Sequence, residues 1–379
     1  MALTLSAEAQ LVRDTALDFF REKSPISALR RLRDTANVDG FSRPLWREMA
    51  ELGWTGFFVA DEHGGSGFGA VGLGQVMEAA GRTLAATPML STAVIGASLI
   101  DMNGSAAQKA AHLPALAAGE RIFALALEEG AHHAPCRIAT TARKVATGYV
   151  IDGDKRFVLD GHVADVLIVV ARTDGERDDP NGITLFLIPA GTQGVTRRRS
   201  SMVDSRNAAW IRMSGVTVGA DAVVGTIGGG AAALDQVLDR ARAALAAEML
   251  GSTCEAFERT VQYLKDRKQF GVPIGSFQAL KHRAAQMFCE IEVTRSAVLA
   301  ALEALDSDAV DAPALVSMAK AKANETFFLV GTEGIQMHGG IGMTDEHEIG
   351  FFTKRARVAQ ASLGDSAFHR DRYAALMGY

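Results

Sequence analysis

Apolar side chains recur at helical spacing through the first third of the sequence. They stand three or four residues apart, for example at Leu45, Met49 and Leu52, which is the period of an amphipathic helix that buries one face. The pattern therefore predicts a helical N-terminal domain over residues 1–120.

The pattern then changes to short strands. Runs of β-branched and apolar residues are separated by turn sequences such as Asp152-Gly153-Asp154 and Pro180-Asn181-Gly182, as expected of an all-β domain inserted between helical regions. We expect this middle domain to span residues 121–225. Its strand-like runs are residues 122–127, 149–151, 166–171, 184–188 and 209–218.

Helical spacing returns after Gly228-Gly229-Gly230, a run with the composition of a hinge. An alanine-rich amphipathic stretch extends from there toward Arg267, with no proline before Pro273, and this predicts one long helix. Four helices are enough for a bundle, so we expect a C-terminal four-helix bundle over residues 226–379. The other helical segments are residues 277–305, 313–338 and 345–363.

Composition and charge exclude several classes of protein. The 379 residues are 48% hydrophobic and 22% charged, which is typical of folded globular proteins. The formal net charge of -5 and the pI near 6.0 give no general attraction to nucleic acid. The sequence has no basic leader before an apolar stretch, and no apolar run reaches the roughly 18 residues of a membrane span. We expect a cytoplasmic protein that binds neither nucleic acid nor membrane.

Histidine and cysteine positions give no metal-binding pattern. The three cysteines lack paired spacing, so we expect reduced thiols rather than zinc ligands or disulfides. The pair His132-His133 has only Glu128 and Glu129 as potential ligands nearby in sequence, and we expect no metal there.

Two other features have the composition of phosphate contacts. The loop between Asp61 and Gly69 contains four glycines, but it lacks the Lys-Ser/Thr of a P-loop. It can equally be a structural turn. The run Arg197-Arg198-Arg199 can meet a ligand phosphate or form a solvated charge cluster.

Three segments together resemble the acyl-CoA dehydrogenase family. The first is Glu51-Leu52-Gly53-Trp54, followed by Asp61-Glu62-His63-Gly64-Gly65. The second is Arg267-Lys268-Gln269-Phe270-Gly271, followed by Ile274 and Phe277-Gln278, and the third is Gln336-Met337-His338-Gly339-Gly340-Ile341-Gly342. The resemblance covers nearly the whole chain. It implies an α+β fold with an N-terminal helical domain, a middle β-barrel-like domain and a C-terminal four-helix bundle.

The resemblance also implies that the last two segments bind FAD. Arginine presents a fixed fork of donors that can hold a pyrophosphate, and glutamine can both donate and accept hydrogen bonds. Glycine lets backbone N–H groups come close to an anion. The implied cofactor contacts in these segments are Arg267, Phe270, Gln278, Gln336, Gly339 and Gly340.

Two strand segments that the resemblance places against the flavin ring depart from the family pattern. Leu127-Glu128-Glu129-Gly130-Ala131-His132-His133 stands where many members carry Thr-Glu-Pro-Gly-Ala-Gly-Ser. Phe157-Val158-Leu159-Asp160-Gly161 resembles Trp-Ile-Thr-Asn-Gly. A hydroxyl donor has thus become leucine twice, at Leu127 and Leu159. Polar contacts to the ring are weakened, while Phe157 can still pack against it.

The implied reaction is FAD-dependent α,β-dehydrogenation of an acyl-CoA thioester to the 2,3-enoyl-CoA. In the family a carboxylate removes the α-proton while the flavin N5 takes the β-hydride, and FAD spans two subunits of a dimer or tetramer. An electron-transfer flavoprotein is the implied electron acceptor. The chain is accordingly expected to form a homo-oligomer or a heterotetramer with a homologous subunit.

Both positions that the family uses for this carboxylate lack an acid here. The family's Tyr-Glu-Gly-Thr string corresponds to Ser362-Leu363-Gly364-Asp365. The alternative position, about two and a half helical turns before Leu250-Gly251, is Ala241. The α-proton is only weakly acidic and needs a positioned base, and neither leucine nor alanine can accept it.

We consider three explanations within the family and one outside it. The base is relocated, with Asp365 the first candidate and Asp239 and Glu248 the next, although Asp365 can instead cap a helix or pair with Arg370. Alternatively, the chain is a half-site subunit of a heteromeric enzyme for bulky, steroid-side-chain-like acyl-CoA, and a homologue supplies the glutamate. A third explanation is another flavin reaction, such as oxygen-dependent oxidation. The nonenzymatic alternative is a structural subunit without cofactor.

Overall fold

The computed structural model describes residues 4–379, which divide into two compact units that interleave along the chain. Three unit boundaries fall inside helices, in α2 (Ile26–Asp34), at the first residue of α4 (Gly69–Arg82) and in α7 (Gly230–Asp266). The three-domain division expected from the sequence stays a prediction. Of the described residues, the helical unit comprises 4–31, Ala70–Ala85 and Arg242–Tyr379, and the sheet unit comprises Leu32–Gly69 and Ala86–Ala241.

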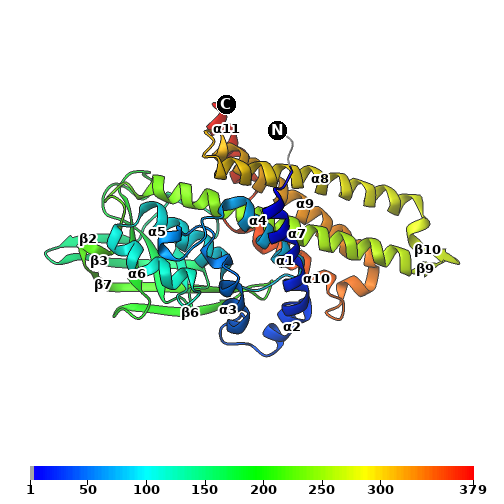
Figure 1. Ribbon diagram of the computed structural model, residues 1–379, viewed down its shortest axis with the longest axis horizontal. Coiled ribbons are helices and arrows are strands. Elements are labelled where there is room, and N and C mark those ends of the chain that lie inside the picture. The colour runs from blue at the N-terminus through cyan, green and yellow to red at the C-terminus, as the bar shows by residue number, and fades with distance from the viewer. Residues whose placement is uncertain (1–3) are drawn as a thin grey trace. The chain divides into compact units, whose positions relative to one another are not determined.

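Long helices make up the helical unit, and α9 lies at their centre. It packs against α8, α10 and α11, as Figure 1 shows. Most faces of α9 carry small or apolar residues, and Val316, Phe327 and Val330 are fully buried. The helices of this unit, besides α2 and α7, are α1 (Ala7–Lys23), α4 (Gly69–Arg82), α8 (Gln278–Asp306), α9 (Ala312–His338), α10 (Ile349–Ala361) and α11 (Ser366–Met377).

Glycines let α4 and α7 touch backbone to backbone. A Cβ added at Gly251 of α7 would lie 1.8 Å from the carbonyl oxygen of Glu78, and one added at Gly81 of α4 would lie 2.0 Å from the carbonyl oxygen of Glu248. No side chain fits at either position, so only glycine permits this close crossing.

Short helices accompany the strands of the sheet unit, and all of them except η4 precede β1 in the chain. The glycine-rich loop forms a tight turn here, because Gly64 has a φ of +82° and a Cβ at Gly65 would meet the carbonyl oxygen of Val59 at 2.0 Å. These glycines therefore serve the turn itself. The helical elements are α3 (Arg43–Glu51), η1 (Trp54–Gly56), η2 (Asp61–His63), the π-helical η3 (Met89–Gly96), α5 (Ala97–Asn103), α6 (Ala106–Ala117) and η4 (Ala220–Ala222).

Eight strands form one sheet in the order β6-β7-β3-β2-β4-β5-β8, and β1 pairs with β4 in parallel. The central strands β4 and β5 are buried along almost their whole length, as expected of continuous apolar runs. The strands are β1 (Phe123–Ala126), β2 (Thr141–Val145), β3 (Gly148–Leu159), β4 (Val166–Arg172), β5 (Ile183–Pro189), β6 (Val195–Ser201), β7 (Asn207–Val218) and β8 (Val223–Val224).

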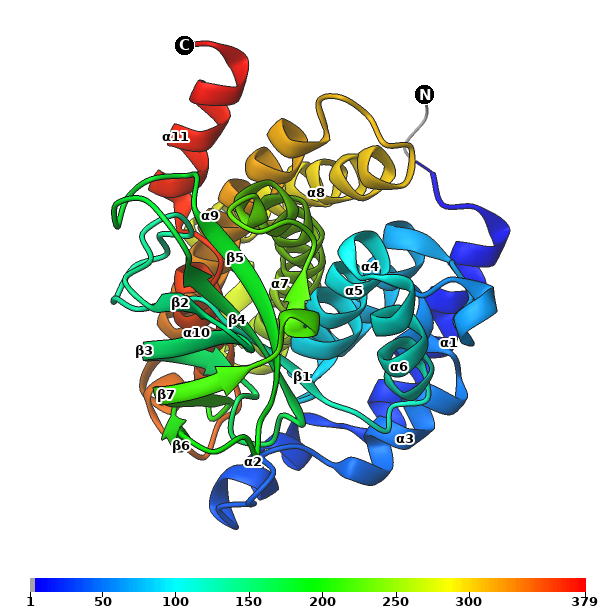
Figure 2. The same ribbon diagram turned by 90° about the vertical axis from the view of Figure 1, so that its left-hand side faces the viewer.

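The expected order of helices, strands and helices is confirmed. Two strands missed from the sequence are polar: β2 reads Thr-Ala-Arg-Lys-Val, and β6 contains the three-arginine run. The missed β8 has only two residues. β6 lies at the edge of the sheet beside β7, as Figure 2 shows, and charged side chains are common on edge strands because they oppose further pairing.

Among residues 4–379, no helix combines the length and apolar character needed to cross a bilayer. The three cysteines are free thiols, with Cys254 buried and Cys136 and Cys289 exposed.

Candidate cofactor and catalytic site

Arg267 begins the short connection from α7 to α8. Strands β9 (Lys268–Gln269) and β10 (Val272–Pro273) pair across a turn in which Phe270 has a φ of +52°, and the Ile274 N–H donates to the Arg267 carbonyl oxygen at 2.8 Å. Phe270 is 90% exposed and Arg267 is exposed. Within residues 4–379 the Arg267 guanidinium makes no hydrogen bond or ion pair, so its donors are available to a ligand.

The same connection ends at the N-terminus of α8, which has no side-chain cap. Phe277 precedes the helix, and its side chain has no hydrogen-bonding oxygen that could cap it. Gln278, the first helical residue, is exposed. Uncapped N–H groups and the helix dipole attract anions. This connection thus provides a fixed cation and unused backbone donors, which are the groups a diphosphate requires.

The end of α9 is open in the same way. Gln336, Gly339 and Gly340 are exposed, whereas His338 between them is buried. Gly339 has a φ of +64°, and a Cβ added at Gly339 or Gly340 would meet no atom within 4 Å. The backbone at this turn can therefore be approached closely by a ligand.

Aromatic stacking brings these two segments together. Tyr263, about one helical turn before Arg267, stacks on His338 with ring centroids 4.4 Å apart, and His347 lies 4.5 Å from His338. The Nδ1 atom of His338 bonds to the carbonyl oxygen of Gly334 at 2.6 Å. Burial lowers the pKa of both histidines. Two neutral rings therefore hold the end of α9 against the end of α7.

The strand residues expected at the flavin ring differ from one another in exposure. Leu127 is 3% exposed and lies in the core of the sheet unit, whereas Leu159 is half-buried. Phe157 is 55% exposed and has a φ of +52°. The register of β3 against β7 shifts between Lys155 and Val158. This bulge turns the Phe157 ring outward, as bulges often do near functional sites.

A buried ion pair fixes the segment that begins at Leu127. The Lys155 ammonium donates to the Leu127 carbonyl oxygen at 3.1 Å and to Glu129 Oε1 at 2.8 Å. Burial lowers the pKa of Lys155 to about 8, and Glu129 acts in the opposite direction. Burial also disfavours ionised Glu129, but Lys155 and hydrogen bonds from Thr140 and Ala139 outweigh it, so its pKa lies below the usual value.

Four side chains hold the α10–α11 junction, where Leu363 occupies the family's glutamate position. Leu363 has a φ of +59° and is nearly buried. Its carbonyl oxygen accepts from Arg242 Nε at 3.4 Å and lies 3.1 Å from His369 Nε2. The carbonyl oxygen of the following Gly364 accepts from Lys320 at 3.1 Å and from Asn324 at 3.3 Å. The junction is therefore locked although its acid is missing.

Lys320 is fully buried beneath this junction. Its ammonium also donates to Asn324 Oδ1 at 2.7 Å and to the carbonyl oxygen of Ala359 at 3.1 Å. Burial, followed by the charges of Arg242 and Arg355, lowers the pKa of Lys320 well below its usual value. The three oxygen acceptors satisfy the donors that burial would otherwise leave unpaired.

The acids nominated as a relocated base have structural contacts. Asp365 is exposed and caps α11, because its Oδ1 accepts from the Phe368 N–H at 2.9 Å. Glu248 is buried and pairs with Arg355 at 2.9 Å. Asp239 is buried as well. Arg370, the alternative partner of Asp365, pairs with Glu325. The helix-cap interpretation of Asp365 accounts for its contacts, and its role as a base stays a prediction.

The three-arginine run and the pair His132-His133 both lie in the sheet unit. Arg197 donates to the Ala164 carbonyl oxygen at 2.8 Å and Arg199 to the Asn37 carbonyl oxygen at 2.6 Å, while Arg198 points to the opposite face of β6. His133 Nδ1 lies 2.5 Å from Glu128 Oε1. Across residues 4–379, no three histidine, cysteine or acidic side chains gather in a metal-binding arrangement.

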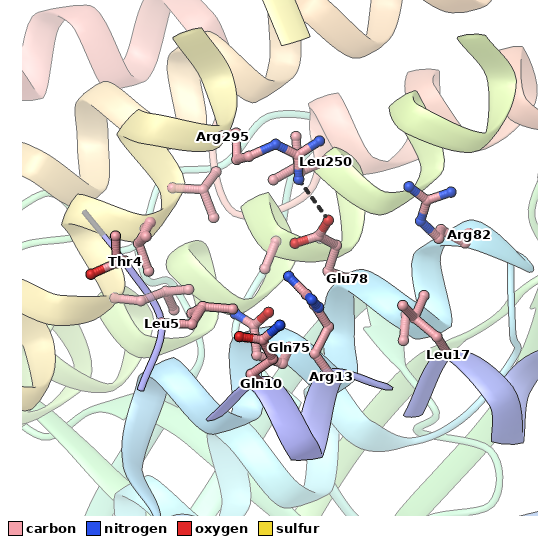
Figure 3. A pocket seen from close by; sticks show the side chains of 16 residues that line it. Thr4, Leu5, Gln10, Arg13, Leu17, Gln75, Glu78, Arg82, Leu250 and Arg295 are labelled. Atoms are coloured by element: carbon pink, nitrogen blue, oxygen red, sulfur yellow. Dashed lines mark hydrogen bonds and ion pairs between the residues drawn. The ribbon is translucent and has the colours of Figure 1, made fainter. Parts of the chain in front are cut away.

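A cavity of about 490 Å³ lies among α1, α4, α7 and α8 in the helical unit. Figure 3 shows Arg295 paired with Glu78, at 3.1 Å. Arg82, also at this cavity, bonds to Glu258 at 3.0 Å. The lining of this cavity includes none of the residues expected to contact the cofactor. Because these arginines are already paired with carboxylates, we assign no ligand to this cavity.

Sequence reasoning did not find Tyr263 or Lys320. Tyr263 carried no motif, and its partner His338 is distant in sequence. Lys320 lies in an apolar helical stretch, and a lysine among buried neighbours is the one signal that could have drawn attention to it, because buried lysines are rare unless paired.

The open end of the helical unit fits the phosphate part of a flavin dinucleotide. It offers an arginine fork, an uncapped helix N-terminus and a bare glycine turn, which are the donors that a diphosphate needs. The strands of the sheet unit fit a flavin ring less well, because Leu127 and Leu159 offer no side-chain donor. Phe157 remains available for packing against a ring.

Comparison with known proteins agrees with this geometry. Family models for the acyl-CoA dehydrogenase N-terminal, middle and C-terminal domains match residues 6–120, 124–216 and 228–378. A probable acyl-CoA dehydrogenase of Bacillus subtilis (strain 168), YngJ, is 30% identical over 98% of each chain.

Two solved structures share the fold. A variant of the Tcur3481-Tcur3483 steroid ACAD has a TM-score of 0.88 and 29% identity over 99% of each chain. The ChsE4-ChsE5 complex from Mycobacterium tuberculosis has a TM-score of 0.89 and 26% identity, covering 100% of this chain and 99% of that chain.

The chain therefore belongs to the acyl-CoA dehydrogenase family. Members of this family are flavin oxidoreductases that act on the CH–CH bond of an acyl-CoA, and FAD is their cofactor. The family, the α+β fold and the cofactor expected from the resemblance are confirmed.

Proposed function

We propose that this chain is the base-deficient subunit of a heteromeric acyl-CoA dehydrogenase. Its α7–α8 connection and the end of α9 hold the FAD diphosphate of a site that a homologous subunit completes. Arg267, Gln278, Gln336, Gly339 and Gly340 make these contacts. The homologous subunit contributes the glutamate that removes the α-proton, because this chain has leucine and alanine at both family positions.

One observation carries this proposal: the cofactor contacts are exposed and open, while the base position is closed and locked. Arg267, Gln336 and Gly339 are all exposed in the single chain, as groups are that contact a ligand shared with a neighbouring subunit. Leu363 is nearly buried. A chain that had lost its cofactor altogether would have no reason to keep an arginine and a bare glycine turn beside each other through the Tyr263–His338 stack.

The substrate class we propose is a bulky acyl-CoA of the steroid-side-chain type. One similar structure is named the Tcur3481-Tcur3483 steroid ACAD, and another is named the ChsE4-ChsE5 complex. When bound, FAD accepts the hydride from the β-carbon. This chain's residues contribute by holding the diphosphate and by packing Phe157 against the ring. An electron-transfer flavoprotein is the acceptor we propose.

The alternative is a self-sufficient dehydrogenase whose base is Asp365. Its Oδ1 is used by the helix cap, so catalysis would depend on the second oxygen. Asp365→Ala tests this alternative. An unchanged rate of dye reduction by the variant removes Asp365 as the base, and a loss of at least about 100-fold identifies it, since a positioned base contributes 10²–10⁴-fold.

Coexpression with a homologous subunit tests the main proposal. We expect the chain alone to be colourless or catalytically inactive, and the copurified complex to be yellow and to reduce a dye with a bulky acyl-CoA. Replacing the partner's glutamate by glutamine should abolish turnover while FAD stays bound. Full turnover by this chain alone would contradict the proposal, and a colourless complex that binds no acyl-CoA by calorimetry would indicate a structural subunit.

A further inference from the structure

Two arginines flank one tryptophan on an outer surface of the sheet unit. The guanidinium carbon of Arg198 on β6 lies 4.6 Å from the ring centroid of Trp210 on β7, and that of Arg156 on β3 lies 5.3 Å from the same ring. Arg198 and Trp210 are directly paired in the sheet register. We call these three side chains the arginine–tryptophan face.

The positive charge of this face is not neutralised by the protein. Arg156 and Arg198 are exposed, and no carboxylate within residues 4–379 pairs with either one. Two neighbouring arginines, by contrast, have partners within the protein. Arg212 pairs with Asp154 at 2.9 Å, and Arg197 donates to a backbone carbonyl oxygen. The whole chain carries a net charge of -5, so this face is a local reversal of sign.

The indole between the two guanidiniums keeps them in place without removing their charge. A cation over an aromatic face gains about 0.5–1 kcal/mol at an exposed site, and a guanidinium in that position can still donate hydrogen bonds at its edges. The arrangement is therefore a preorganised pair of cations. A pair of this kind suits carboxylates on an opposing surface more than a small ligand, because nothing encloses it.

The face adjoins the residue expected to contact the flavin. Arg156 directly precedes Phe157 in the β3 bulge, and the outward-turned Phe157 ring is 55% exposed. Under the proposed function, Phe157 packs against the flavin ring, so the face lies next to the point where electrons leave the protein.

We infer that the arginine–tryptophan face docks the acidic surface of an electron-accepting protein. This inference rests on the proposed function for the position of the flavin. Oxidation of the acyl-CoA removes two electrons and two protons from the substrate; the docked acceptor takes up both electrons, and the protons pass to solvent. Complexes between redox proteins have small interfaces, and their association is steered by complementary charges. Two unpaired cations on an exposed surface can steer an acidic partner in this way.

The test separates electron exit from acyl-CoA chemistry. The FAD-loaded complex is reduced anaerobically with stoichiometric dithionite and mixed in a stopped-flow instrument with the electron-transferring flavoprotein of the same organism. Binding of that flavoprotein to the oxidised complex is measured separately by calorimetry at low and high salt. Each readout compares the wild type with the double variant Arg156→Ala/Arg198→Ala, with Arg156→Lys/Arg198→Lys, and with Arg143→Ala, an exposed arginine on β2.

We expect the double alanine variant to bind the flavoprotein about tenfold more weakly and to lose most of the salt dependence of the second-order rate constant. The lysine variant should keep most of the affinity, and Arg143→Ala should match the wild type. Identical binding and salt dependence in the double alanine variant and Arg143→Ala would overturn the inference.

Ferricyanide, a small trivalent anion, provides the second arm. If the double alanine variant slows reoxidation by ferricyanide but leaves flavoprotein binding unchanged, the face attracts small anions and the inference is wrong. A complex that binds no FAD contradicts the proposed function instead, and calorimetric binding of the flavoprotein to that complex still tests the face.

Discussion

The α10–α11 junction and the α7–α8 connection are built in opposite ways. The junction has Leu363 at the position expected for the family's acid, and the connection is where we propose that FAD binds. At the junction, side chains of Arg242, Lys320, Asn324 and His369 surround two backbone carbonyl oxygens. At the connection, Arg267 and the N-terminus of α8 face outward with no partner in the described chain.

This difference shows which side chains of a site can be replaced without a change in the local backbone conformation. The conformation of the junction is set by backbone contacts, so the side chain at position 363 can be an acid or an alkane with little effect on the fold. The connection depends on its side chains for any affinity at all. Loss of the base and retention of the cofactor contacts are therefore structurally compatible in one chain.

The largest expected effect comes from returning the missing groups to the locked junction. Leu363→Glu combined with Leu127→Thr and Leu159→Thr should raise the turnover of this chain with acyl-CoA by about 10²–10⁴-fold over the threonine double variant, because the two variants differ only in the restored base. Dye reduction measures it. Leu363→Gln in the same background is the control, and equal rates for the Glu and Gln variants would show that the junction does not present this position to substrate.

Removing the cation beneath the junction should be the next largest effect. Lys320→Met removes one donor from each of three buried oxygen acceptors, although the Gly364 carbonyl oxygen keeps its bond from Asn324. The loss should lower the free energy of unfolding by about 3 kcal/mol. Urea titration of the FAD-free protein measures this. Lys322→Met on the same helix, where the lysine is partly exposed and pairs with Glu290, should cost less than about 1 kcal/mol. Equal losses in the two variants would mean that Lys320 does not support the junction.

The open connection should respond in affinity rather than stability. Arg267→Ala in the assembled complex should weaken FAD binding by about 10–100-fold, since a charged hydrogen bond contributes about 1.5–3 kcal/mol, while the melting temperature of the FAD-free form stays unchanged. Fluorescence titration with FAD measures it, with the neighbouring Lys268→Ala as the control. A loss of equal size in Lys268→Ala would point to general charge attraction instead of a specific contact.

The smallest expected effect is a change of pH dependence in the sheet unit. The pKa of Glu129 is lowered in the folded state, so its ionised form contributes stability above the unfolded value of 4.5, and that stability is lost as pH falls through the folded pKa. Below pH 4.5, Glu129→Gln should therefore show a shallower decline in unfolding free energy than the wild type, by at most about 1.4 kcal/mol per pH unit. Parallel declines would show that Lys155 does not hold Glu129 ionised.

Much of the fold follows from hydrophobic period. The long helices and the buried strands β4 and β5 have strong patterns because each buries a continuous apolar face. β6 has no hydrophobic pattern. Its arginines alternate between backbone carbonyl contacts on one face of the strand and Trp210 on the other. These contacts exist only in the folded sheet, so the sequence alone did not indicate a strand.

The site was predictable in part. Arg267, Gln336 and the glycine turn belong to local motifs, whereas their proximity depends on Tyr263 meeting His338 across two helices. The cap made by Asp365 has the composition of a helix N-terminus. Lys320 could not be assigned, because its three acceptors come from its own helix, the end of α10 and the α10–α11 junction.

The glycine-mediated crossing of α4 and α7 has a consequence for how the chain can be divided. Gly81 and Gly251 leave room only for the opposing main chain. A fragment that starts after α4 would therefore expose the surface of α7 that α4 normally covers. The C-terminal helices, though they follow one another without interruption, are thus not an excisable module. Expressed without the first 85 residues, they should aggregate instead of forming a stable bundle.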